Sequence, residues 1–205
     1  MKVIILDFDG VLVDSLDSHV GFYRDKAREH GFDTGLVPSD CRQHSHVVDQ
    51  IIIQTGFSPE LIQDIMNKHY HEFDDSYPLE LFPGAERMVT NFNGIDDVRL
   101  VIVSSNTLEN VQRGLGGLFD LFDMVFTKED MNGDMTKAEG ISLAVMTFGA
   151  RVGDAIYIGD MNSDRLAAEE AGVIFIGVSY GWQINDTNIL DIPTLELEIK
   201  RALML

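Results

Sequence analysis

Five short runs rich in valine and isoleucine constrain the fold of this chain more than any other feature of its sequence. They are Val3–Leu6, Val98–Val103, Met124–Phe126, Ala155–Ile158 and Val173–Val178. Short, continuous apolar runs of this kind are typical of strands buried on both faces of a parallel sheet. Between them, helices are expected at Ala85–Phe92, Leu108–Leu118, Lys137–Phe148 and Ser163–Ala171. Strands that alternate with helices predict an α/β fold with a doubly wound parallel sheet.

The segment between the first two runs breaks this alternation. From Leu16 to Leu81 it contains no convincing strand, and its patterns predict helices at 16–30, 39–55 and 59–73. Glycine and proline residues separate these patterns, as expected for turns. We therefore predict two domains: an α/β core made of residues 1–15 and 82–205, and an inserted α-helical domain at 16–81.

The charge and the cysteine content narrow the range of partners and compartments. The formal net charge is -19, which repels phosphate backbones and anionic lipids and argues against nucleic acid and membranes as partners. Any phosphate site must therefore be positive locally. The single cysteine, Cys41, excludes an internal disulfide and fits a reducing compartment. No stretch approaches the roughly 20 apolar residues of a membrane helix, so we expect a soluble, cytoplasmic protein.

Polar residues follow three of the predicted strands directly. Asp7-Phe8-Asp9-Gly10 follows the first strand, Ser104-Ser105-Asn106 the second, and Gly159-Asp160 with nearby Asp164 the fourth. Lys137 begins the helix that precedes the fourth strand. Because the carboxyl ends of parallel strands share one edge of a sheet, where ligands bind, we expect these side chains to meet in one crevice.

Several carboxylates in one crevice repel each other, and burying them without a partner is costly. A bound hard dication resolves this conflict, and oxygen ligands that leave room for a substrate phosphate suit Mg2+. Asp7 and Asp160 are the best candidate ligands, together with the backbone carbonyl of Asp9. Asp164 is expected nearby, where it would orient metal-bound water.

The same residues suggest a reaction with a phosphate ester. The carboxylate of Asp7 could attack phosphorus and form an aspartyl-phosphate. Asp9 is placed to protonate the leaving oxygen and later to take a proton from the hydrolytic water. Ser104, with the backbone amides of Ser105 and Asn106, is expected at a helix start, which favours a phosphate anion. Lys137 would add a positive charge beside the phosphate and Asp7.

These motifs resemble those of the haloacid dehalogenase-like hydrolase superfamily, in its phosphoglycolate phosphatase-like branch with a helical cap. The stretch from Asp7 to Ser15 is similar to the first motif of that family. Ser104 is similar to the second motif, Lys137 to the third, and Gly159-Asp160 with Asp164 to the fourth. Four motifs in the right order are specific, although each alone is weak. The resemblance implies a magnesium-dependent phosphatase acting on a small phosphorylated metabolite, such as phosphoglycolate or a sugar phosphate. It also implies that the insert at 16–81 is a cap that selects the substrate and excludes water.

Four further predictions concern less specific residues. Arg42 is the best candidate in the insert for binding a substrate anion, and His19 is a second candidate because it lies five residues after Asp14. Gly10 is expected to contribute its backbone to the substrate site, since it makes the turn after Asp9 possible. The acidic stretch around Glu196 and Glu198 is interpreted as a solvated helix face.

Other functions remain open at this stage. A sugar-phosphate mutase of the beta-phosphoglucomutase type is the nearest rival, because His19 and Arg42-Gln43-His44-Ser45 faintly resemble the cap of that branch. However, Pro38 stands where the mutase cap has a lysine. A non-catalytic phosphoacceptor or regulatory protein would also use acids, a serine and a lysine at strand ends. The sequence does not indicate an oligomeric state.

Overall fold

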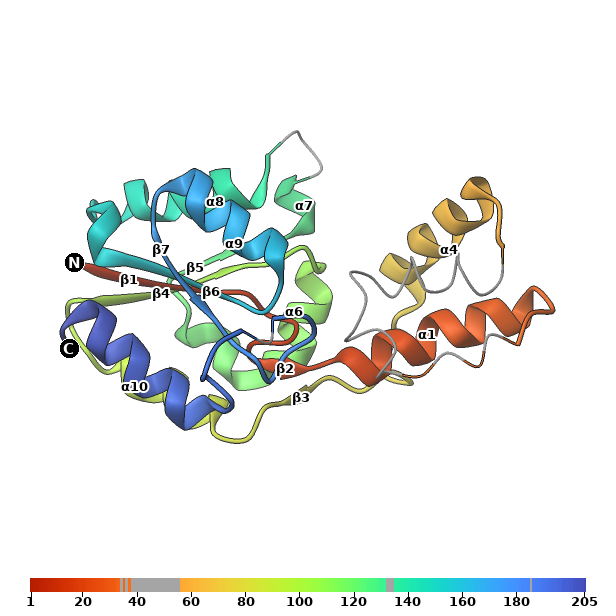
Figure 1. Cartoon of the computed structure of the whole chain (residues 1–205), viewed down its shortest axis with the longest axis horizontal. Coiled ribbons are helices and arrows are strands. Elements are labelled where there is room, and N and C mark those ends of the chain that lie inside the picture. Colours follow the sequence, from red (N-terminus) through yellow and green to blue (C-terminus); the bar gives the residue numbers. More distant parts are fainter. Residues whose placement is uncertain (34, 36, 38–55, 132–134, 185) are drawn as a thin grey trace. The chain divides into compact units, whose positions relative to one another are not determined.

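The computed structural model describes residues 1–33, 35, 37, 56–131, 135–184 and 186–205 (Figure 1). The chain forms two compact units. An α/β unit contains Met1–Asp14 and Glu80–Leu205, and a helical unit contains Ser15–Leu79. Among the described residues, no helix is both long and apolar enough to span a membrane.

A five-stranded parallel sheet forms the centre of the α/β unit. Its strands are β1 (Lys2–Leu6), β4 (Val98–Val103), β5 (Met124–Phe126), β6 (Ala155–Gly159) and β7 (Ile174–Gly177). Their order is β5-β4-β1-β6-β7, and every neighbouring pair is parallel. Each strand begins and ends within one residue of one of the five predicted apolar runs. The predicted α/β fold class is thus confirmed.

Helices cover both faces of this sheet. They are α5 (Ala85–Asn93), α6 (Leu108–Leu115), α7 (Lys128–Met131), α8 (Lys137–Thr147), α9 (Asn162–Ala171) and α10 (Ile192–Leu203). Figure 1 shows α8 and α9 on one face and α10 on the other. Short 3-10 helices occupy Gly116–Leu121 and Val152–Asp154.

Alternation along the strands builds the core. Val3 and Ile5 of β1 join Tyr157 of β6 in a buried cluster with α8 and α9. Ile4 is equally buried and points to the opposite face, because successive side chains of a strand alternate. Burial on both faces explains why the runs are apolar throughout.

Three sequence predictions for the α/β unit require correction. The helix expected at Leu108–Leu118 ends at Leu115, because two glycines follow and a 3-10 helix begins at Gly116. Two short strands were missed: β2 (Val13–Asp14) pairs antiparallel with β3 (Glu80–Leu81). Two residues are too few to show an alternating pattern, so their pairing was not recognisable.

The interpretation of Glu196 as part of a solvated helix face was also wrong. Its side chain is buried in α10, where it accepts hydrogen bonds from Lys200 Nζ (2.7 Å) and Asn91 Nδ2 (3.2 Å). Arg87 lies 3.7 Å away and adds a second positive charge. A carboxylate can be buried when donors of this kind replace its water, and no local pattern reveals them.

The helical unit contains α1 (Leu16–Glu29) and α4 (Pro59–Glu72) among its described residues. Lys26 joins the two helices, because its Nζ donates to Glu29 (2.8 Å) and to Glu72 (2.5 Å). Aromatic rings pack around Phe22, which meets Phe73 and Tyr77 edge-on. The predicted helices at 16–30 and 59–73 are therefore present, and the one at 39–55 lies outside the described residues.

Candidate active site

The three central strands bring three sequence motifs to one edge of the sheet. Asp7 follows β1, Ser104 follows β4 and Asp160 follows β6, and β1 lies between the other two. The backbone N–H of Asp7 donates to the carbonyl of Ile158 (2.9 Å), which extends the pairing of β1 and β6 up to the acidic residue. Residues more than 150 positions apart in the sequence are adjacent for this reason.

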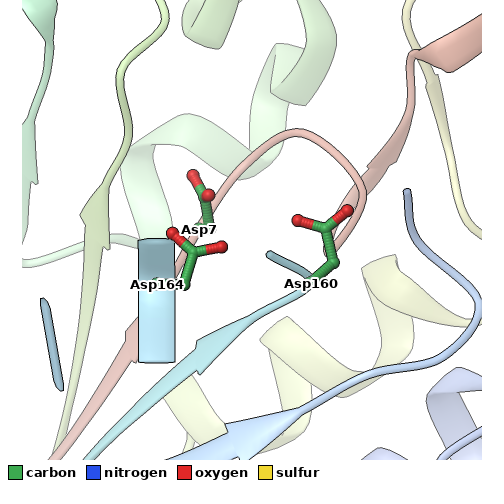
Figure 2. Close-up of side chains that lie close together, drawn as sticks. All are labelled: Asp7, Asp160 and Asp164. Carbon is green, nitrogen blue, oxygen red and sulfur yellow. The ribbon is translucent and has the colours of Figure 1, made fainter. Parts of the chain in front are cut away.

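Three carboxylates meet at this edge (Figure 2). One oxygen each of Asp7, Asp160 and Asp164 lies within 4.8 Å of the others. The three residues are almost completely buried, with exposed fractions of 4%, 1% and 0%. Asp164 belongs to the first turn of α9, where its Oδ2 accepts the Met161 N–H (3.0 Å) and helps to cap the helix.

Lys137 supplies the positive charge at this cluster. Its Nζ lies 2.7 Å from Asp7 Oδ2 and 2.7 Å from Asp164 Oδ1. Lys137 is the first residue of α8, and a capping box fixes this helix start. In the box, Thr136 Oγ1 accepts from the Glu139 N–H (3.2 Å), and Glu139 Oε2 accepts from the Thr136 N–H (2.7 Å).

One lysine does not balance three buried acids. Burial raises the pKa of Asp7 to about 7, although Lys137 opposes this change and Asp164 adds to it. Burial also holds the pKa of Asp160 well above its ordinary value. For Lys137 burial acts to lower the pKa, but the charges of Asp164 and Asp7 outweigh it and raise the pKa. The excess negative charge and the all-oxygen donor set fit a divalent cation.

Backbone groups around Asp160 were not foreseen from the sequence. The Trp182 N–H donates to Asp160 Oδ2 (2.5 Å). Gly10 and Gly181 leave room for this carboxylate, since a Cβ at either position would overlap with it. The glycines in the two loops were the available signal, but their partner could not be read from the sequence.

Tyr157 is a further residue that the sequence analysis missed as part of the site. Its hydroxyl lies 3.2 Å from Asp164 Oδ1 and 3.2 Å from the carbonyl oxygen of Val103. Tyr157 belongs to β6, and its ring is fully buried in the core cluster between the sheet and the helices α8 and α9. A tyrosine in an apolar strand run looks like a core residue, so its polar contact was hidden.

Asp9 and the segment after β4 form the second half of the site. Asp9 is not part of the acidic cluster, and its Oδ2 accepts a hydrogen bond from Asn106 Nδ2 (2.8 Å). The Asn106 N–H donates to Ser104 Oγ (3.1 Å). The helix itself begins at Leu108, as predicted, with Thr107 as its N-cap, so Ser104 lies three residues before this cap. Ser105 is exposed beside these residues.

The two residues predicted in the insert belong to the helical segment of the chain and not to the α/β unit that holds this site. His19 is buried within the helical unit, where its ring stacks on Phe73 with centroids 4.7 Å apart. Arg42 lies outside the described residues. Their expected roles in substrate binding stay predictions.

Comparison with known proteins decides the family. A family model described as "Haloacid dehalogenase-like hydrolase" matches residues 4–178 of the chain. The chain belongs to this family. The resemblance noted from the four motifs is confirmed, and the chain is an enzyme of the hydrolase class that this family represents.

Known relatives and solved structures match this haloacid dehalogenase-like hydrolase over most of its length. A phosphoglycolate phosphatase of Synechococcus elongatus is 29% identical, over all of this chain and 96% of the relative. The pyrophosphatase PpaX of Halalkalibacterium halodurans is 27% identical, over 88% and 84% of the two chains. A haloacid dehalogenase-like family hydrolase of Streptococcus pneumoniae has the same fold, with a TM-score of 0.72, 20% identity and 97% coverage of each chain.

Proposed function

We propose that this hydrolase is a magnesium-dependent phosphatase that cleaves small phosphate monoesters through an aspartyl-phosphate on Asp7. The observation that carries this proposal is the buried cluster of Asp7, Asp160 and Asp164 with Lys137 at the carboxyl edge of the sheet. The phosphoglycolate phosphatase relative supports the same class of substrate.

In the proposed reaction, the carboxylate of Asp7 attacks phosphorus while the bond from phosphorus to the ester oxygen breaks. Lys137 and the Phe8 N–H, which donates to Asp7 Oδ1 (2.8 Å), hold the nucleophile in one orientation. Asp7, Asp160 and the Asp9 carbonyl would hold Mg2+, and Asp164 would hold water bound to it. The cation would reduce the repulsion between carboxylate and phosphate.

Asp9 has the acid and base roles in this scheme. It gives a proton to the leaving oxygen, and then takes a proton from the water that attacks the aspartyl-phosphate. That second attack releases inorganic phosphate and restores Asp7. Ser104 and the Ser105 N–H are proposed to hold the phosphate oxygens. To take part, the Asn106 N–H would have to leave Ser104 Oγ, and the Gly10 N–H would have to leave the carbonyl of Val13 (2.9 Å).

The helical unit is proposed to act as the cap domain. Arg42 and His19 would contribute to substrate choice there. No partner other than a small phosphorylated metabolite is required by this scheme. Pyrophosphate is a second candidate substrate, because one relative is a pyrophosphatase. A mutase remains the alternative chemistry, and dependence on a sugar bisphosphate activator would identify it.

The experiment is a phosphate-release assay on a panel of compounds, with Mg2+ or with EDTA. The panel contains 2-phosphoglycolate, glucose 6-phosphate, 4-nitrophenyl phosphate and pyrophosphate. We expect release that depends on Mg2+, and a loss of at least about a thousandfold in kcat for Asp7→Asn, since removal of a nucleophile has large effects.

Asp154→Asn is the matched control for this assay. Asp154 lies just before β6, at the opposite edge of the sheet, and pairs with Lys2 (2.6 Å). We expect its activity to be within about twofold of wild type, because a partly exposed ion pair contributes little. An Asp7→Asn protein that keeps its activity would rule out the proposed mechanism.

A further inference from the structure

A chain of side-chain amides leads from α6 to Asp9. Asn106 Nδ2 donates to Asp9 Oδ2 (2.8 Å), and Asn110 Nδ2 donates to Asn106 Oδ1 (2.8 Å). Arg113 Nη2 in turn donates to Asn110 Oδ1 (3.2 Å). Both asparagines are buried, with exposed fractions of 6% and 3%. All of these residues belong to the α/β unit.

The direction of these hydrogen bonds follows from the backbone. The Thr107 N–H can only donate, so the Asn106 atom that lies 2.8 Å from it must be the carbonyl oxygen Oδ1. The other atom of this amide, Nδ2, therefore faces Asp9. Asn106 Oδ1 also accepts from Asn110, so that amide must present its own Nδ2 to Asn106. The guanidinium of Arg113, which has donors only, then meets the remaining oxygen of Asn110.

The capping of α6 does not explain the buried amide of Asn110. Asparagine is among the less favourable residues inside a helix, and burying an amide costs free energy unless its hydrogen bonds are made. Thr107 already caps α6, since its Oγ1 accepts from the Asn110 N–H (3.3 Å). A leucine of similar size would keep the cap made by Thr107 but would remove the hydrogen bonds to Asn106 and Arg113. What the amide of Asn110 adds is the fixed orientation of Asn106.

We propose that Asn106 and Asn110 are positioning residues that hold Asp9 in the orientation needed to protonate the leaving group. This inference rests on the proposed function, in which Asp9 is the acid. Asn106 fixes the rotation of the Asp9 carboxylate by binding one of its oxygens. Asn110 acts through Asn106 and does not contact Asp9. Proton donation matters most when the leaving oxygen is basic, as in an alkyl phosphate, and least for a nitrophenolate, which leaves without a proton.

The test compares leaving groups in wild type, Asn106→Ala, Asn110→Leu and the double variant. The readout is kcat/KM at saturating Mg2+ for the best alkyl ester of the panel and for 4-nitrophenyl phosphate. For Asn110→Leu we expect a loss of about tenfold with the alkyl ester, because small displacements of a reacting group are costly. With 4-nitrophenyl phosphate we expect a change within about twofold.

The double variant tests whether the two residues act in series. We expect it to be no slower than Asn106→Ala alone, because residues in one network are not additive. Asn91→Leu is the control, since Asn91 on α5 also donates an amide hydrogen bond to a carboxylate, that of Glu196, although Asn91 itself is exposed. Asn110→Ser removes the amide donor with a smaller change of shape, and serves if Asn110→Leu is poorly folded by circular dichroism.

Equal losses with both substrates, or fully additive losses in the double variant, would overturn the inference while leaving the phosphatase proposal in place. A wild-type protein that releases no phosphate from any panel compound with Mg2+ would overturn the proposed function and this inference together. A selective loss with the alkyl ester supports both.

Discussion

At the scale of single residues, the protonation of Asp7 bears on stability as well as on catalysis. Its pKa rises from the ordinary 3.8 to about 7 in the folded protein, chiefly because the side chain is buried. Between these two pH values the folded protein therefore holds a proton that the unfolded chain has already lost. The contribution of Asp7 to the free energy of unfolding therefore falls as pH rises through this window, which is the reverse of the usual behaviour of a carboxylate with a lowered pKa.

We predict that the metal-free protein becomes less stable between about pH 4 and pH 7. The contribution of Asp7 is at most about 4 kcal/mol, since each unit of pKa corresponds to about 1.4 kcal/mol. Urea unfolding in EDTA at several pH values measures it. Asp7→Asn should show a shallower decline than wild type, and Mg2+ should stabilise wild type more at pH 8 than at pH 5. Stability that rises over this range in EDTA would contradict the prediction.

At the scale of elements, the turn after β1 matters because it brings the backbone against Asp160. Gly10 has a φ of 72°, a left-handed conformation that is costly for other residues. A Cβ there would also overlap with the Asp160 carboxylate. Gly172 ends α9 with a φ of 73°, yet a Cβ there would meet nothing within 4 Å. The two glycines thus share a conformation and differ in their surroundings.

Gly10→Ala and Gly172→Ala separate these two effects. We expect Gly172→Ala to lose about 1 kcal/mol of unfolding free energy from backbone strain alone. Gly10→Ala should lose more than this, and should weaken the stabilisation by Mg2+ because Asp160 must move. Thermal unfolding with and without Mg2+ provides both values. Equal effects of the two substitutions would show that the approach to Asp160 is unimportant.

At the scale of the whole molecule, the net charge of -19 acts against an anionic substrate. The positive charge of Lys137 operates only within the site, whereas the field of the surface acts at long range. Salt screens the long-range field more than contacts inside a buried site, since the Debye length is about 10 Å at 0.1 M.

We therefore predict that kcat/KM for a phosphate monoester rises by a few-fold between low ionic strength and about 0.2 M KCl, at saturating Mg2+. The effect should appear in KM, and kcat should change little. Initial rates at several KCl concentrations measure both constants, with choline chloride as a control for potassium. A steady decline in kcat/KM with salt would mean that the field near the site entrance is positive.

The sequence alone determined the sheet and the convergence of its motifs. The apolar runs identify the strands, and the shared carboxyl edge of a parallel sheet places Asp7, Ser104 and Asp160 together without any knowledge of side-chain contacts. The role of Lys137 was inferred because it stands at a predicted helix start and occupies the third place in the order of motifs. These inferences depend on local patterns and on a general rule of topology, so they required no tertiary detail.

Only the tertiary structure decided which groups surround these acids. The hydroxyl of Tyr157, the N–H of Trp182 and the amides of Asn106 and Asn110 reach the site because helices and loops pack at particular distances from the sheet. The direction of a side chain across such a contact depends on residues far away in the sequence, as the burial of Glu196 also shows. The periodicity of a local sequence pattern does not depend on those distances. For that reason these hydrogen bonds could not be predicted from the sequence.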